Sequence, residues 1–153
     1  MRILTSKVIV AICAAFIASA VAKADDEVAK CDARTLQGDY GFHVEGVVVA
    51  IPGIVLPPGG VPLRGVAMTR FDGRVKLTQV DFITVNGQAP PVDWAPGSGE
   101  YTVNPDCTGT WSLSIPGNPL SPAKVHFVIV KRGAEIRTVV DANAVTSIGV
   151  RVN

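Results

Sequence analysis

Short runs in which apolar and polar residues alternate make up most of the chain after residue 24. In residues 38–50, Tyr40 and Phe42 fall on one face and His43 falls on the other. A repeat of two residues is typical of a β-strand with one buried face. The same alternation predicts strands over residues 61–71, 74–85, 124–130, 135–140 and 145–152, and a central hairpin with Tyr101 and Val103 opposite Trp111, Leu113 and Ile115.

The strand over residues 74–85 departs from this pattern. Its apolar face switches between Leu77 and Val80, which predicts a β-bulge near Thr78 and Gln79. Asp81 shares a face with Gln79, and we interpret that face as solvent-exposed.

Clusters of glycine and proline separate the alternating runs. The chain has 15 Gly and 11 Pro, all of them after residue 24, and no later segment has a helical period. Tight turns are predicted at residues 71–73, 104–109 and 131–133, where Asp-Gly, Pro-Asp and Arg-Gly supply turn geometry. Longer loops are predicted at residues 50–60, 86–98 and 116–122, each with two or more prolines.

Eight short strands joined in succession favour an all-β fold. Closing the sheet removes its two exposed edges, so we expect an eight-stranded antiparallel up-and-down β-barrel. A barrel of this size is filled by side chains or holds one small ligand. A two-sheet β-sandwich is the alternative. In a barrel of this order, connections alternate between the ends, so all three long loops are expected at one end.

The N-terminal segment has the features of a secretory signal peptide. Arg2 and Lys7 precede an apolar run over residues 8–21, and residues 22–24 read Ala-Lys-Ala, a cleavage signal. We therefore expect cleavage after Ala24, a single domain over residues 25–153, and a secreted or periplasmic protein. An uncleaved membrane anchor is the alternative, although the apolar run is shorter than the roughly 20 residues that a spanning helix needs.

Charge argues against two classes of partner. Arg2, Lys7 and Lys23 leave with the signal peptide, after which acidic residues slightly outnumber basic ones. No basic patch stands out, so we expect neither nucleic acid nor an anionic membrane surface as a partner.

The cysteines predict one disulfide. Cys13 lies in the signal peptide, which leaves Cys31 and Cys107, and an even number in an exported chain indicates a bond between them. Cys107 lies in the turn over residues 104–109, and Cys31 precedes the first strand. Both therefore belong to the end of the barrel with the tight turns. Two cysteines without neighbouring ligands do not make a zinc site.

Three parts of the chain carry a resemblance to known proteins: Gly38-Asp39-Tyr40-Gly41-Phe42, Phe71-Asp72-Gly73, and Gly99-Glu100-Tyr101-Thr102-Val103 leading into Asp106-Cys107-Thr108-Gly109-Thr110. They resemble a family of small secreted bacterial proteins, and the resemblance covers most of residues 25–153. It implies export but supplies no activity or catalytic residues. The expected barrel is similar in shape to allene-oxide-cyclase-like and dirigent-like barrels, a likeness of fold that does not establish function.

No catalytic residue, metal site or cofactor is predicted. His43 and Glu45 share a strand face and could form an acid–base or metal pair, but the opposite face carries the aromatic residues, so we expect both in solvent. We expect the same of His126. Residues 97–99, Gly-Ser-Gly, lack the Gly-x-Ser-x-Gly pattern of a hydrolase nucleophile.

Apolar residues on the long loops are the remaining candidates for function. They either plug the mouth of the barrel or line a pocket there. We consider three functions: binding of a small apolar ligand at the long-loop end, a cyclase- or isomerase-like enzyme, and a structural protein with a filled core that contacts a protein partner. The sequence does not decide among them. The residues expected to bind a ligand are Ile54, Leu56, Leu63, Trp94, Tyr101 and Ile115.

Overall fold

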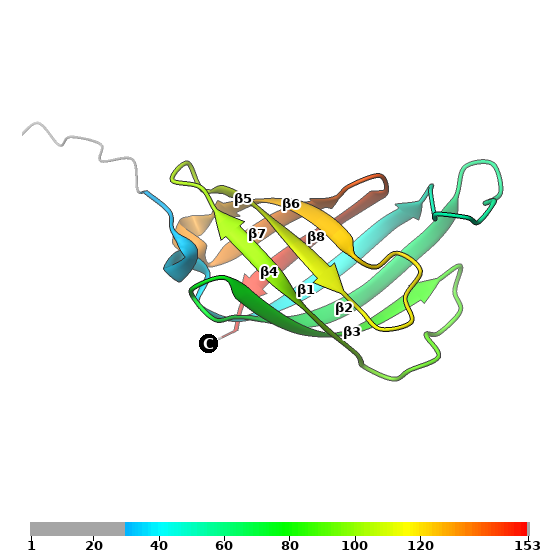
Figure 1. Ribbon diagram of the computed structural model, residues 1–153, viewed down its shortest axis with the longest axis horizontal. Helices are drawn as coiled ribbons and strands as arrows, with labels where there is room; N and C mark the ends of the chain where they lie inside the picture. The colour runs from blue at the N-terminus through cyan, green and yellow to red at the C-terminus, as the bar shows by residue number, and fades with distance from the viewer. Residues whose placement is uncertain (1–29, 153) are drawn as a thin grey trace, which may run out of the picture.

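Eight antiparallel strands close into a barrel in the computed structural model, which describes residues 30–152 (Figure 1). Each strand pairs with its neighbours in sequence, and β8 pairs with β1. The predicted up-and-down β-barrel is therefore confirmed, and the sandwich alternative is not. The predicted signal peptide, residues 1–24, lies outside the described residues. The elements are η1 (Ala33–Leu36), β1 (Gly38–Val48), β2 (Val61–Phe71), β3 (Lys76–Val85), β4 (Ala95–Val103), β5 (Thr108–Ser114), β6 (Ala123–Val130), η2 (Lys131–Gly133), β7 (Glu135–Val140) and β8 (Ala144–Arg151), where η marks a 3-10 helix.

Alternation along the strands places one apolar face inside the barrel. In β1, Tyr40 and Phe42 are buried, whereas the next residue, His43, points outward and is exposed. In β6, Val125 and Phe127 are buried in the same way. Closure then gives every strand two neighbours, so the sheet has no free edge.

The connections at the two ends of the barrel differ in length, as predicted. Because consecutive strands run in opposite directions, every second connection falls at the same end. The long-loop end, on the right in Figure 1, carries the three long loops, residues 49–60, 86–94 and 115–122, and also the short turn over residues 141–143 between β7 and β8. The short-turn end, on the left, carries residues 72–75, 104–107 and 131–134.

The disulfide lies at the short-turn end. Cys31 is bonded to Cys107, with Cα atoms 4.9 Å apart. The backbone N–H of Cys31 also donates to the carbonyl of Pro105, 3.2 Å away, in the turn between β4 and β5. The predicted pairing and its position are both confirmed.

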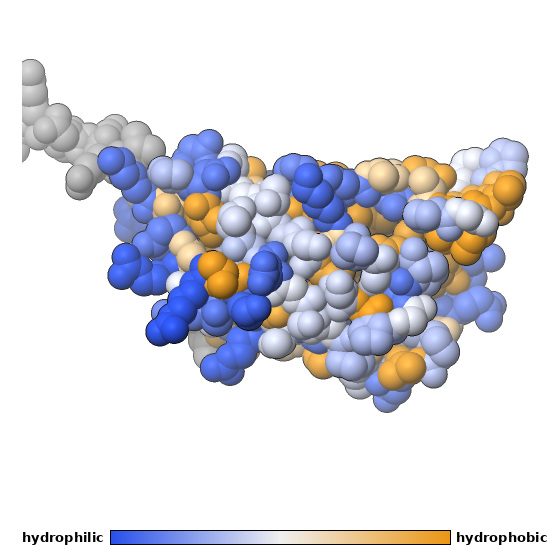
Figure 2. Space-filling model, viewed as in Figure 1, coloured by the Kyte–Doolittle hydropathy of each residue, from blue (hydrophilic) through white to orange (hydrophobic). Residues whose placement is uncertain are grey.

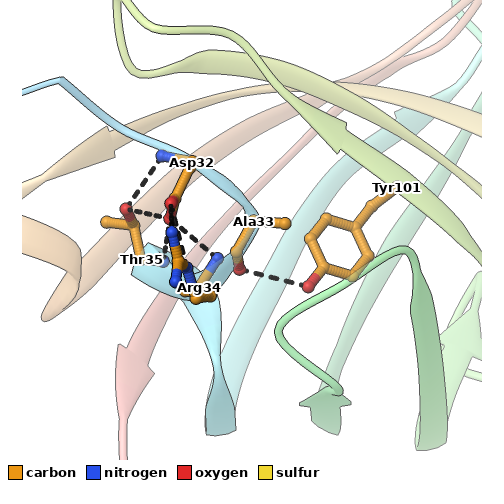
Figure 3. A network of polar contacts seen from close by, with 5 residues as sticks. All are labelled: Asp32, Ala33, Arg34, Thr35 and Tyr101. Atoms are coloured by element: carbon orange, nitrogen blue, oxygen red, sulfur yellow. Dashed lines mark hydrogen bonds and ion pairs between the residues drawn. The ribbon is translucent and has the colours of Figure 1, made fainter.

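Helix η1 closes the short-turn end. Asp32 caps the helix by accepting backbone hydrogen bonds from Arg34 and Thr35 at 2.9 and 3.2 Å (Figure 3). Leu36 is fully buried against the barrel interior. From β4, the Tyr101 hydroxyl donates to the Ala33 carbonyl at 3.2 Å, so the helix is held from inside the barrel (Figure 3).

Arg151, at the end of β8, joins three segments of this closed end. Its guanidinium donates to the carbonyls of Thr35 at 2.7 Å and Gly133 at 3.2 Å, and also to that of Gln37. It lies over the Tyr40 ring, 4.9 Å from the centroid. One side chain therefore connects η1, η2 and β8.

The predicted β-bulge in β3 is wrong. The register with β2 runs without interruption from the Phe71–Leu77 pair to the Leu63–Val85 pair. Gln79 and Asp81 therefore point into the barrel, while Val80 lies outside and is 39% exposed. Our interpretation assumed that apolar residues must face inward, whereas this interior accepts polar side chains that are hydrogen-bonded.

Strand β4 begins earlier than predicted, inside the loop expected over residues 86–98. It starts at Ala95, and Pro96 pairs with Val80 of β3. The pairing of β4 with β5 begins only at Ser98. Pro96 therefore lies where β4 has one neighbouring strand, and its missing N–H removes no bond to a second one.

Candidate functional site

The half of the barrel towards the long-loop end is hollow. It contains a cavity of about 600 Å³ lined by inward residues of the strands and by residues of the loops at that end. The lining is largely apolar, with Val44, Leu63 and Ile83 among the wall residues. In Figure 2, apolar residues are also visible on the surface at the long-loop end, on the right. The cavity volume is in the range of small-molecule sites, about 300–1,000 Å³.

An aromatic cluster closes the cavity on the short-turn side. We call it the aromatic floor, and it consists of Tyr40, Phe42, Phe71, Tyr101, Trp111 and Phe127. Trp111 is central, with its ring centroid 5.9 Å from that of Phe42, 5.7 Å from that of Phe71 and 5.1 Å from that of Phe127. Phe42 and Trp111 face the cavity. The barrel interior is thus packed with side chains at the short-turn end and hollow towards the long-loop end.

A chain of hydrogen bonds runs up the wall from β2 to β3. The Thr69 hydroxyl donates to Gln79 Oε1 at 2.8 Å, and Gln79 Nε2 donates to Asp81 Oδ2 at 2.8 Å. Asp81 is 4% exposed and lines the cavity. Burial raises the pKa of its carboxyl, and the hydrogen bond from Gln79 opposes that shift.

The wall opposite β3 carries a second polar pair. Strand β7 lies four strands from β3 in either direction around the barrel. There the hydroxyls of Thr138 and Ser147 are 2.6 Å apart and face the cavity. The interior therefore has polar groups on two sides of an otherwise apolar space.

Other ionisable groups that line the cavity lie at its mouth. Lys124 Nζ is 3.8 Å from Asp141 Oδ2, and the Lys124 side chain is 61% exposed. Asp141 Oδ1 also contacts His126 Nδ1 at 2.6 Å. These charges balance one another, and solvent reaches them.

The structure brings two of the six predicted ligand-binding residues to the cavity. Leu63 and Ile115 line it. Ile54 is exposed on the loop after β1, and Leu56 packs near the mouth against the cluster around Val48. Neither of these two is part of the lining.

The two predicted aromatic residues lie elsewhere. Trp94 is 49% exposed, and its ring lies 6.3 Å from that of Phe82 on the outer surface. Tyr101 is 2% exposed and belongs to the aromatic floor, where Phe71 packs edge-on against it at 5.0 Å. The expectation that these two rings line one cavity is therefore wrong. Trp94 lies on the outer surface of the barrel, and Tyr101 lies at its closed end.

Sequence reasoning missed Gln79 and Asp81 as cavity residues. The signal was available: an unbroken repeat of two runs from Leu77 through Gln79 and Asp81 to Ile83. His43 and Glu45 are exposed on the outer face of β1, as expected. Within residues 30–152, no three His, Cys, Asp or Glu side chains cluster as a metal site. In the same range, no helix has the length and apolar character needed to span a bilayer.

Comparison with protein-family models, with curated proteins and with solved structures gave no match. The resemblance to a family of small secreted bacterial proteins stays a prediction. Function must therefore be argued from the site itself.

Proposed function

We propose that the protein binds one small, largely apolar molecule inside the barrel, entering at the long-loop end. The observation that supports this proposal is the cavity of about 600 Å³ above the aromatic floor. Filling an apolar cavity with a ligand removes apolar surface from water, at roughly 25 cal/mol per Å². A filled barrel that serves only as a contact surface has no use for such a space.

We further infer that the protein acts outside the cytoplasm. The Cys31–Cys107 disulfide requires an oxidising compartment to persist. The predicted signal peptide over residues 1–24 agrees with this location.

Binding is tested with an uncharged fluorophore, phenylnaphthylamine, whose emission rises in apolar surroundings. Ala67, a small residue of the cavity wall, is replaced by Phe to occupy part of the space. The matched control is Val66→Phe, because the neighbouring side chain points outward and is exposed. We expect saturable binding to the wild type and to the control, and a loss of about tenfold or more in Ala67→Phe.

Two results would contradict the proposal. One is a wild-type protein that shows no saturable binding of the fluorophore and releases no small molecule in native mass spectrometry. The other is equal weakening by Ala67→Phe and Val66→Phe, which would place the binding site outside the barrel. Circular dichroism and thermal melting of all three proteins establish that each is folded.

A second candidate, a cyclase- or isomerase-like enzyme, is favoured by one observation. Asp81 is a buried carboxyl with a raised pKa in an apolar cavity, a combination suited to proton transfer. As a base, Asp81 would take a proton from a carbon next to a carbonyl, leaving the electron pair in an enolate, and would then return the proton.

This candidate is tested by deuterium exchange. An aryl ketone that binds in the cavity is incubated in heavy water, and deuterium uptake is followed by mass spectrometry. Uptake that is accelerated by the wild type and lost in Asp81→Asn supports the enzyme. Uptake at the uncatalysed rate with wild-type protein and bound ketone argues for a binding protein.

A further inference from the structure

Asp81 is a carboxylate with unused hydrogen-bonding capacity inside the cavity. Gln79 Nε2 donates to its Oδ2, but no residue among 30–152 donates a hydrogen bond to its Oδ1. The side chain is 4% exposed and lines the cavity. A group in the cavity is therefore the partner available to Oδ1.

The Thr69–Gln79 chain makes Asp81 an acceptor. The Gln79 carbonyl oxygen already accepts from the Thr69 hydroxyl, so its amide N–H₂ faces Asp81. Turning the amide around would place its carbonyl oxygen against a carboxylate oxygen, and two acceptors repel. A donor from Gln79 stabilises the ionised carboxylate and holds it in place.

No cation of the described chain neutralises this carboxylate. Of the ionisable residues that line the cavity, Lys124 and Asp141 are the other two, and they pair with each other at the mouth. The residues opposite Asp81 on the neighbouring strands are Ala67 of β2 and Ala95 of β4, neither of which is charged. An opposite charge beside a buried carboxyl stabilises its ionised form, so the cavity complements a positive charge.

The register places an aromatic surface at a fixed span from Asp81. Asp81 pairs with Ala67 of β2, which pairs in turn with Phe42 of β1. Two strand spacings amount to roughly 10 Å. Between them the wall carries only the methyl group of Ala67, so the space from Asp81 to Phe42 and Trp111 is open to a ligand.

We propose that the cavity binds an arylalkylamine, with its protonated amine on Asp81 Oδ1 and its ring on Phe42 and Trp111. This inference rests on the proposed function, because it assigns a chemical class to the molecule in the same cavity. The apolar walls take the body of the ligand, and the ammonium donates a charge-assisted hydrogen bond to the carboxylate.

Three probes that share an indole ring test the choice of head group: tryptamine with an ammonium, tryptophol with a hydroxyl, and indoleacetate with a carboxylate. Affinities are measured by calorimetry at neutral pH. Tryptamine is expected to bind tightest and indoleacetate weakest. This order is read from wild-type protein and needs no variant.

The carboxylate is then removed in Asp81→Asn, with Glu45→Gln as the matched control that removes an exposed negative charge from the outer face of β1. Tryptamine affinity should fall about ten- to a hundredfold in Asp81→Asn, the range for a hydrogen bond to a charged group, and stay unchanged in Glu45→Gln. Indoleacetate should bind no more weakly to Asp81→Asn than to the wild type.

Phenylnaphthylamine binding distinguishes failure of the amine assignment from failure of the proposed ligand-binding function. If phenylnaphthylamine binds in the barrel but tryptamine shows no preference over indoleacetate, the amine assignment is overturned and the ligand-binding function stands. If an equal loss of tryptamine affinity occurs in Asp81→Asn and Glu45→Gln, the attraction is a surface effect and the assignment is again overturned. If the fluorophore does not bind, both proposals fail.

Discussion

Removal of the Cys31–Cys107 disulfide should lower stability strongly and leave the cavity intact. The bond joins residues 76 positions apart. In the chain-entropy model, a disulfide that closes a loop of this length lowers the entropy of the unfolded chain and so stabilises the folded state by about 4.5 kcal/mol. For a domain of this size, each kcal/mol shifts the melting temperature by roughly 4 °C. The Cys31→Ala/Cys107→Ala variant should therefore melt about 15–20 °C below the wild type.

Urea unfolding followed by tryptophan fluorescence is the direct assay. Trp111 lies buried in the aromatic floor and reports the core, whereas Trp94 is on the outer surface. The midpoint should fall, and the dependence of free energy on urea should steepen because the unfolded chain is less restricted. Wild-type protein unfolded with a reductant present should reach the same midpoint as the double variant.

Ligand affinity provides the internal control. The disulfide lies at the short-turn end, while the cavity opens at the long-loop end and is separated from it by the aromatic floor. Phenylnaphthylamine should thus bind the folded double variant as tightly as the wild type. A double variant that melts within a few degrees of the wild type would refute the entropic reasoning, and one that loses the fluorophore would refute the separation of the two ends.

Three further outcomes follow from the same structure. Arg151→Ala should lose about 2–3 kcal/mol in urea unfolding, because its guanidinium bonds carbonyls of separate segments, whereas exposed Arg70→Ala should change stability by less than about 0.5 kcal/mol. Burial raises the pKa of Asp81 above 3.8, so the folded state binds this proton more tightly, and the stabilisation present at low pH is lost as pH rises through the folded pKa. Asp81→Asn should therefore gain stability relative to the wild type as pH rises across that interval, and a constant difference would contradict the shift. Burial also raises the pKa of Tyr101 to about 12 and that of Tyr40 above 10, so the tyrosinate absorbance of the folded protein should stay low near pH 10.

The strands and their order were predictable because they depend on local properties. Alternation of side chains, the turn chemistry of Asp72-Gly73 and the proline-rich loops each act over a few residues. Closure of the barrel follows because the first and last strands would otherwise leave their backbone hydrogen-bonding groups unpaired at the sheet edges. The position of the Cys31–Cys107 disulfide then follows from counting connections, and the structure confirms it.

The orientation of β3 was missed because polarity was used to assign faces. Polarity alone predicts that Gln79 and Asp81 face water and that Val80 faces the core. In this barrel, the hydrogen bonds from Thr69 through Gln79 to Asp81 satisfy the polar groups inside. Pairing with β2 imposes an unbroken register, and that register outweighs the preference of any one side chain.

The amino-acid sequence alone thus predicted an all-β chain, the order of its strands, the end that carries each loop and the Cys31–Cys107 disulfide. Tertiary structure decided where the aromatic rings gather, so that Tyr101 lies in the floor while Trp94 packs outside. It also decided that the barrel is hollow above that floor and that Asp81 faces the hollow. The physical reason is that a cavity is the space left unfilled by the inward side chains of all eight strands together. Its volume therefore cannot be read from the pattern of any one strand.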